Sequence, residues 1–309
     1  MSKTAKTLVI IAFVIVLGVI GLVTFHSNQS PIGPAPSGPL QVVAAENFWG
    51  SIVSQIGGSH VHVLSIVSDP NADPHEYESN TMNARAVAGA NYIIENGAGY
   101  DSWMDKLLGA SANPHRTVLN VATLLGKQDG DNPHFWYNPD YVNQASAQME
   151  RDLAAIDPAN AAYYEAQYTT LQASLAEYQN RIASIKRQFS GTPVAATEDI
   201  FAYLAQAAGL NLISPPAFIQ AVAEGNDPPA ASVVEFENQL KSKSVKILVY
   251  NEQTVTPLTE NIKALAADQN IPVVGVTETI QPPDASFEEW MNAQLLNIEN
   301  ALNAQALGQ

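Results

Sequence analysis

The sequence predicts an α/β protein of two lobes, each a mainly parallel sheet flanked by helices, with a long rigid helix joining them. Three observations support this fold class. The chain has 309 residues, which exceeds one typical domain of roughly 100–200 residues. Apolar strand patterns alternate with helical patterns in residues 41–138 and again in 191–309, as in parallel sheets covered by helices. Residues 139–190 show helical periodicity without a strand signal.

The first 26 residues have the pattern of an export signal or a membrane anchor. Lys3 and Lys6 precede an uncharged apolar run from Leu8 to Phe25. This run is longer than the usual signal-peptide core of about 7–15 residues, and no small-x-small cleavage site follows it. We therefore expect an uncleaved anchor that places the rest of the chain outside the cytoplasm, tethered to the membrane. Residues 27–40 are rich in Pro, Gly and Ser and predict a linker.

The N-terminal lobe, residues 41–138, begins with a strand and a helix. Gln41 opens the apolar segment VVAAE, and the amphipathic segment NFWGSIVSQIGG follows it. The β-branched run of residues 60–68 predicts a second strand, which ends in the turn-rich segment DPNADPHEYE. Helix, strand, helix and strand are then expected over TMNARAVAGA, ANYIIENG, YDSWMDKLLGA and RTVLNVA.

The helical bridge, residues 139–190, and the C-terminal lobe, residues 191–309, follow. Pro139 to Ile156 and Pro158 to about Phe189 predict two helices. Strands are expected over TPVAAT, VKILVY and IPVVGV, and helices over EDIFAYLAQAAG, ASVVEFENQLKSK and TPLTENIKALAADQN. A final helix is expected from Phe287 to about Leu307.

Composition excludes several classes of function. The chain has 14 Lys and Arg against 30 Asp and Glu, a net charge of −16. This charge repels phosphate backbones, so nucleic acid is not expected as a partner, and it attracts cations, although it also suits plain solubility. The absence of cysteine excludes disulfides, thiolate zinc sites, cysteine nucleophiles and a lipidated cysteine. Any metal site must therefore use His, carboxylate or amide ligands.

Residues just after strands are the first candidates for ligand binding, because open α/β sheets bind at the carboxyl ends of their strands. His75 follows the second strand in DPHEYE, His134 lies in NPHFWY at the end of the first lobe, and Glu198 directly follows TPVAAT. In each Asx-Pro-His triplet the proline restrains the turn that presents the imidazole. A helix-capping role for His75 and a core role for His134 stay open. The third such triplet ends at His115, which we expect to be structural or exposed.

Four motifs in this order, DPHEYE, NPHFWYNPD, ATEDIFAYL and VYNEQTVTPLTENI, resemble those of the cluster A-I metal-binding lipoproteins. These are the solute-binding proteins of zinc and manganese ABC importers, and the resemblance runs from Gln41 to the C-terminus. It implies an ion held in a cleft between the lobes, with His75, His134 and Glu198 as ligands. It also implies an ABC permease and its ATPase as partners. We expect a monomer without enzymatic activity.

The fourth ligand is where the sequence departs from this family. Its manganese-binding members place an aspartate in the last loop, whereas the stretch here is Tyr250-Asn251-Glu252-Gln253-Thr254. Asn251 lies nearest by register and is the expected ligand through its carbonyl oxygen. Glu252, a water molecule, and a plain turn role for Asn251 stay open.

The expected donor set suits Zn²⁺, Fe²⁺ and Mn²⁺. The Irving–Williams order makes Zn²⁺ the first expectation for the captured ion and Mn²⁺ the second. The long His-rich loop of many zinc-specific relatives is missing, which counts against a dedicated zinc scavenger.

Two other classes of function stay open. Two His and one carboxylate also form the sites of non-haem iron oxygenases and zinc hydrolases. Those enzymes usually place two ligands close in sequence, whereas the candidates here lie far apart and no H-E-x-x-H motif occurs. A surface adhesin on the same scaffold is the second alternative, because a fold does not fix a function.

Overall fold

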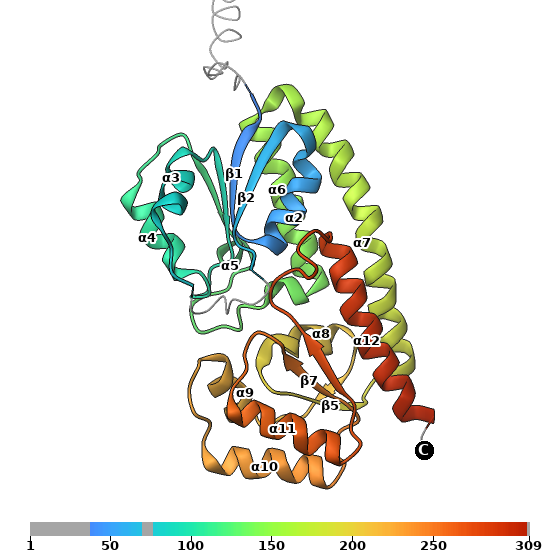
Figure 1. The fold of residues 1–309 in the computed structure, drawn as a ribbon. Helices are drawn as coiled ribbons and strands as arrows, with labels where there is room; N and C mark the ends of the chain where they lie inside the picture. The colour runs from blue at the N-terminus through green and yellow to red at the C-terminus, as the bar shows by residue number, and fades with distance from the viewer. Residues whose placement is uncertain (1–37, 70–76, 308–309) are drawn as a thin grey trace, which may run out of the picture. The chain divides into compact units, whose positions relative to one another are not determined.

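Two four-stranded parallel sheets form the framework of the computed structural model, which describes residues 38–69 and 77–307 (Figure 1). The first sheet has the strand order β2-β1-β3-β4, with β1 (Leu40–Glu46), β2 (Val61–Val67), β3 (Tyr92–Glu95) and β4 (Thr117–Asn120). The second has the order β6-β5-β7-β8, with β5 (Pro193–Ala196), β6 (Asn211–Leu212), β7 (Leu248–Asn251) and β8 (Val273–Val276). Every pairing is parallel. Together with the long helix between the sheets, this confirms the predicted fold class.

Helices cover both faces of the first sheet, because successive strand residues point to opposite faces. Val42 and Ala44 pack toward α2 (Asn47–Gly57) and α6 (Pro139–Ile156). Val43 and Ala45 pack on the other face toward α3 (Thr81–Gly89) and α4 (Ser102–Ala110). The short helix α5 (Val121–Leu124) follows β4.

The second sheet is covered in the same way. On one face it packs against α8 (Ala202–Ala207) and α12 (Phe287–Leu307). On the other face it packs against α9 (Pro216–Ala223), α10 (Ala230–Lys241) and α11 (Pro257–Asp268). Strand β6 and helix α9 were not anticipated from the sequence.

Two consecutive helices, α6 and α7 (Ala161–Phe189), connect the sheets (Figure 1). Asn138 caps α6 by accepting two backbone N–H bonds, and Pro139 occupies its first turn. The break at Asp157-Pro158 separates it from α7, whose 29 residues span roughly 40 Å. Helix α12 packs along α7. The boundaries drawn at residues 138 and 190 stay predictions.

Several sequence predictions fall outside the described residues. These are the anchor (1–26), the linker up to residue 37, and His75. Among the residues described, no helix is both long and apolar enough to cross a membrane.

Candidate metal centre

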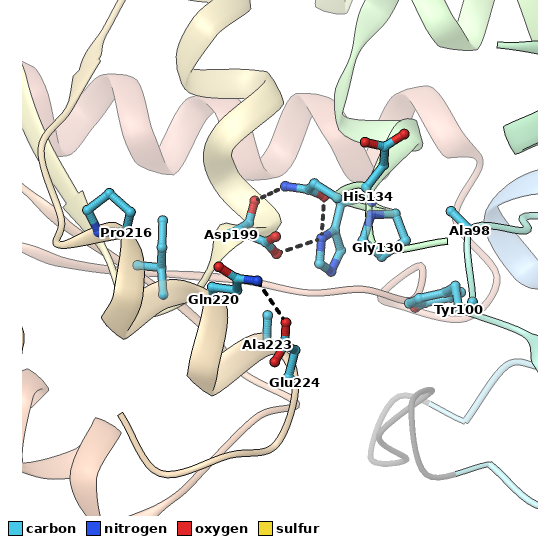
Figure 2. A pocket seen from close by; sticks show the side chains of 14 residues that line it. Ala98, Tyr100, Gly130, His134, Asp199, Pro216, Gln220, Ala223 and Glu224 are labelled. Atoms are coloured by element: carbon cyan, nitrogen blue, oxygen red, sulfur yellow. Dashed lines mark hydrogen bonds and ion pairs between the residues drawn. The ribbon is translucent and has the colours of Figure 1, made fainter. Parts of the chain in front are cut away.

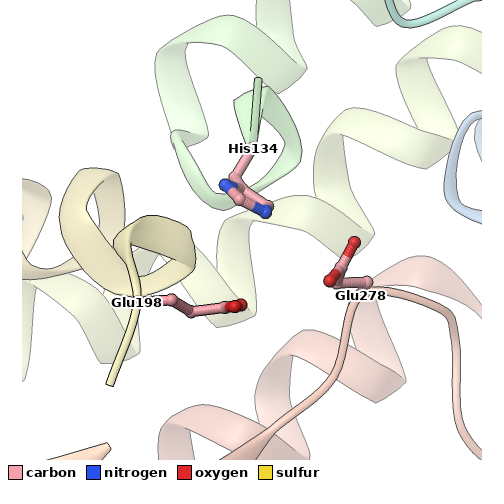
Figure 3. A group of neighbouring side chains, drawn as sticks. All are labelled: His134, Glu198 and Glu278. Atoms are coloured by element: carbon pink, nitrogen blue, oxygen red, sulfur yellow. The ribbon is translucent and has the colours of Figure 1, made fainter. Parts of the chain in front are cut away.

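Three buried side chains from distant parts of the chain converge at one point. His134, Glu198 and Glu278 each offer a ligand atom, and these atoms all lie within 4.8 Å of one another (Figure 3). None of the three side chains is exposed to more than 1%. One imidazole and two carboxylates in this arrangement form a donor set that suits a divalent transition metal.

The second sheet brings two carboxylates and an amide to one edge. Glu198 lies two residues after β5, Asn251 is the last residue of β7, and Glu278 lies two residues after β8. Strand β7 pairs with β5 on one side and β8 on the other, all in parallel. The carboxyl ends of the three strands therefore meet, with Asn251 between the two glutamates.

The amide of Asn251 links the two carboxylates. Its Nδ2 donates to Glu198 Oε1 at 2.5 Å and to Glu278 Oε1 at 2.6 Å, and a third acceptor, Thr254 Oγ1, lies at 3.0 Å. Its Oδ1 accepts the backbone N–H of Gln253. The amide nitrogen, which is a donor and not a metal ligand, thus faces the carboxylates. Coordination of an ion by the Asn251 oxygen stays a prediction.

The ring of His134 is oriented through its Nδ1 atom. Asn132 Oδ1 lies 2.9 Å from Nδ1 and Asp199 Oδ1 lies 3.2 Å from it (Figure 2). Acceptors at Nδ1 place the ring proton there, so Nε2 is the nitrogen suited to coordinate a metal. Burial lowers the pKa of His134, but the hydrogen bond and charge of Asp199 and the charges of Glu278 and Glu198 together outweigh it and raise the pKa above its usual value.

A cavity of about 550 Å³ opens beside His134 (Figure 2). One wall consists of loops that follow strands of the first sheet and includes Tyr100 and Asn132. The opposite wall includes Asp199 and part of α9. Of the three clustered side chains only His134 is among the described residues that line this cavity, so the cavity lies beside the cluster.

The negative charge of Glu278 disfavours ionisation of the neighbouring Glu198. Burial, followed by the charge of Glu278, raises the pKa of Glu198 to about 8. Nearby His134 and the Asn251 hydrogen bond act in the opposite direction. Glu198 therefore favours its protonated form at neutral pH. A divalent cation supplies the missing positive charge, so its binding should displace this proton.

The structure brings together two of the four ligands expected from the sequence. His134 and Glu198 lie in the cluster, and Asn251 contacts it through its amide. His75 lies outside the described residues, and the ligand roles of all four residues stay predictions. Glu252, the alternative fourth ligand, is exposed, and its carboxylate lies against Gly275.

Glu278 was missed by the sequence analysis. It lies in Thr277-Glu278-Thr279, directly beyond the predicted strand IPVVGV. The rule that singled out Glu198, an acidic residue just after a buried strand, applies equally to Glu278. The fourth ligand was expected one strand earlier, in the loop after β7.

Asn251→Asp should destabilise the metal-free protein by about 2 kcal/mol, because two donated hydrogen bonds to carboxylates become contacts between acidic groups. Saturating Zn²⁺ should recover this loss, since an ion attracts all three carboxylates. Asn120→Asp is the control, because Asn120 donates to Glu95 away from the cluster. Thermal unfolding with and without Zn²⁺ measures both effects. Equal recovery in the two variants would contradict the role given to Asn251.

Comparisons with known proteins give the family and the fold of the chain. The family model described as "Zinc-uptake complex component A periplasmic" matches residues 42–301. A manganese ABC transporter substrate-binding lipoprotein, PsaA of Streptococcus mitis, is 26% identical over 315 residues, covering 93% of this chain and 95% of the relative.

Solved structures show the same fold. A crystal structure of ZnuA has a TM-score of 0.69 at 23% identity, covering 85% of this chain and 99% of that one. The periplasmic zinc binding protein TroA from Treponema pallidum has a TM-score of 0.71 at 15% identity, covering 86% of this chain and 99% of that one. The SBP FpvC from Pseudomonas aeruginosa, in complex with Mn²⁺, has a TM-score of 0.71 at 19% identity, covering 86% of this chain and 99% of that one.

Proposed function

Because this chain belongs to the zinc-uptake complex component A periplasmic family, we propose that it captures a divalent transition-metal ion outside the cytoplasm and delivers it to an ABC importer. The observation that carries this proposal is the convergence of His134, Glu198 and Glu278 in one buried cluster. PsaA, which is named as a manganese ABC transporter substrate-binding lipoprotein, supports the transport role.

The proposed ligands are His75, His134, Glu198 and Glu278. His134 comes from the loop before the turn Phe135–Tyr137, on the side of the first sheet, whereas both glutamates follow strands of the second sheet. An ion bound by them would lie between the two lobes and would hold them together. Release to the importer then requires the lobes to separate or one loop to move, because such an enclosed site exchanges its ion slowly.

Asn251 has a different role in this proposal from the one its register suggested. Its amide holds the two carboxylates near each other while no ion is bound. The oxygen of its side chain is engaged by the Gln253 backbone, and Glu278 supplies the second carboxylate. A site of two imidazoles and two carboxylates results.

Zn²⁺ is the first proposed cargo and Mn²⁺ the second. Imidazole and carboxylate donors bind both ions, and the Irving–Williams order favours zinc when a site imposes no geometric preference. The named relatives include both zinc and manganese binders, so the choice of ion depends on this chain's own site.

The importer's permease and its ATPase are the proposed partners, and the protein is proposed to act as a monomer. The apolar run from Leu8 to Phe25 is the proposed membrane anchor, in place of the lipid that the named lipoproteins carry. Members of the family are substrate-binding proteins and not enzymes. Neither the metalloenzyme nor the adhesin alternative is favoured by these relatives.

Metal titration by calorimetry tests the proposal. The metal-stripped, full-length protein in detergent should bind one Zn²⁺ per chain, and Mn²⁺ more weakly. Glu278→Ala should lose most of this affinity, whereas Glu252→Ala should keep it, because Glu252 is exposed. The ligand assignment is wrong if Glu252→Ala loses Zn²⁺ affinity and Glu278→Ala keeps it. The capture function is wrong if the wild-type protein binds neither ion.

A further inference from the structure

Glu278 lies just past the point where the strand pairing of β7 and β8 ends. The paired residues run as far as Asn251 and Val276, and the N–H of Glu252 still donates to the carbonyl of Val276 at 2.9 Å. Both chains leave the sheet there. Glu278 and Thr279 are fully buried, so their backbone N–H groups need acceptors other than a neighbouring strand.

The side chain of Gln253 supplies an acceptor for both groups. Its Oε1 accepts the backbone N–H of Glu278 at 2.7 Å and that of Thr279 at 3.0 Å, and the Thr279 hydroxyl donates to it at 3.3 Å. The backbone N–H of Gln253 donates to Asn251 Oδ1 at 3.0 Å, which fixes the loop from which this side chain extends. One amide oxygen thus replaces a strand carbonyl and binds the peptide groups on both sides of Glu278.

The loop after β7 therefore holds Glu278 by its side chain and by its backbone. Asn251 Nδ2 donates to Glu278 Oε1 at 2.6 Å, and Tyr100 donates to Oε2 at 2.5 Å from the loop after β3. Gln253 fixes the backbone from which the carboxylate extends. A site residue keeps its position to within about 0.5 Å only when the groups that support it are themselves fixed.

The segment around the glutamate has other anchors, which do not involve Gln253. The Tyr137 hydroxyl donates to the carbonyl of Thr277 at 2.8 Å, and the N–H of Ile280 donates to Asn47 Oδ1 at 3.0 Å. These bonds should keep the segment in place when the Gln253 oxygen is removed. The change is then confined to the two peptide groups beside the glutamate.

We propose that Gln253 is a positioning residue that fixes the backbone of Glu278, so that the carboxylate meets the captured ion in one preset geometry. The inference rests on the proposed function, because it takes Glu278 as a ligand. Without the Gln253 oxygen, the peptide groups beside Glu278 can rotate, and part of the binding free energy is spent on ordering the ligand. Residues that orient metal ligands typically contribute 10- to 100-fold in affinity.

The test replaces Gln253 with methionine in the full-length, metal-stripped protein. Methionine has a similar length but lacks the amide oxygen. A cavity of about 520 Å³ borders Gln253, so a shorter side chain would admit water as a substitute acceptor. Gln239→Met is the control, because Gln239 in α10 is also half-buried and its amide donates to the carbonyl of Ile213 at 2.8 Å, outside the metal cluster.

Gln253→Met is expected to weaken Zn²⁺ binding about tenfold, measured by competition with a chromophoric chelator. The titrations are made well below the unfolding temperatures of the metal-free proteins, so that a loss of stability alone does not change the affinity. Gln253→Met should also alter the visible absorption of bound Co²⁺, which depends on the geometry of the ligands. Gln239→Met should change neither quantity, even where it lowers the unfolding temperature.

A double-mutant cycle shows whether Gln253 acts through Glu278. In Glu278→Ala no carboxylate remains to be positioned, so adding Gln253→Met should change the residual Zn²⁺ affinity by no more than about twofold. An equal loss in both backgrounds, or no loss in Gln253→Met alone, overturns this inference and leaves the proposed function standing if the wild-type protein binds Zn²⁺. Failure of the wild-type protein to bind Zn²⁺ overturns both.

Discussion

His134→Ala is expected to weaken Zn²⁺ binding more than a hundredfold while the protein still folds. Structural zinc sites with four ligands bind with about 10–16 kcal/mol, so one ligand accounts for about 3 kcal/mol, or more than a hundredfold in affinity. His134 is fully buried, and Asn132 and Asp199 already fix its ring. The loss should therefore exceed that of a flexible surface histidine. Competition with a chromophoric chelator measures it.

The chain supplies a matched control for this experiment. His115 follows Asn113-Pro114 as His134 follows Asn132-Pro133, but His115 is exposed and outside the cluster. His115→Ala should bind Zn²⁺ as the wild-type protein does. The Zn²⁺ affinity of Asp199→Asn should lie between those of His134→Ala and His115→Ala. We expect a loss of about 10- to 100-fold, because the substitution weakens the partner that orients the imidazole. Wild-type affinity in His134→Ala would remove His134 from the site.

The fold was largely predictable because buried parallel strands leave clear apolar runs in the sequence. VKILVY and IPVVGV predicted β7 and β8, and Pro139 and Asp157-Pro158 correctly marked the ends of α6. Strand β6 was missed because its two residues are too few to form a pattern. Helix α9 was missed because the Pro215-Pro216 pair resembles a loop, although Pro216 occupies the first turn of that helix.

The candidate site was less predictable, because it depends on which strands are neighbours. The motif around His134 and the position of Glu198 after a strand were sufficient to single out both residues. The place of β7 between β5 and β8 cannot be read from the chain order. It is this order that puts Glu278 opposite Glu198 and leaves Asn251 between them. The bond from Tyr100 to Glu278 spans 178 residues and has no local sequence signal.

The second large effect is expected in the pH dependence of the metal-free protein, whose free energy of unfolding should fall as the pH rises from about 4.5 to about 8. Burial and the charge of Glu278 raise the pKa of Glu198 from 4.5 to about 8. Between these values the folded protein holds a proton that the unfolded chain has released, so each rise in pH favours unfolding. The full shift corresponds to a loss of about 5 kcal/mol.

Other buried acids contribute in the same direction, so the metal site must be isolated by a variant. Burial also raises the pKa of Glu95 to about 7 and that of Asp101 to about 6. Glu198→Gln removes the titrating group while keeping its shape, and the slope of its unfolding free energy against pH should be clearly smaller. Denaturant titrations of the metal-stripped proteins at several values from about pH 5 to about pH 8 give both slopes.

Zn²⁺ should reverse the trend, because it binds the deprotonated carboxylates and so stabilises the folded protein more as the pH rises. The same titrations in excess Zn²⁺ therefore give a second, independent measure of the site. Wild-type and Glu198→Gln curves that run parallel without metal would show that Glu198 holds no proton at neutral pH. Exchange of a Glu198 proton for the ion would then be excluded. Capture would have to proceed at a site in which Glu198 is already ionised.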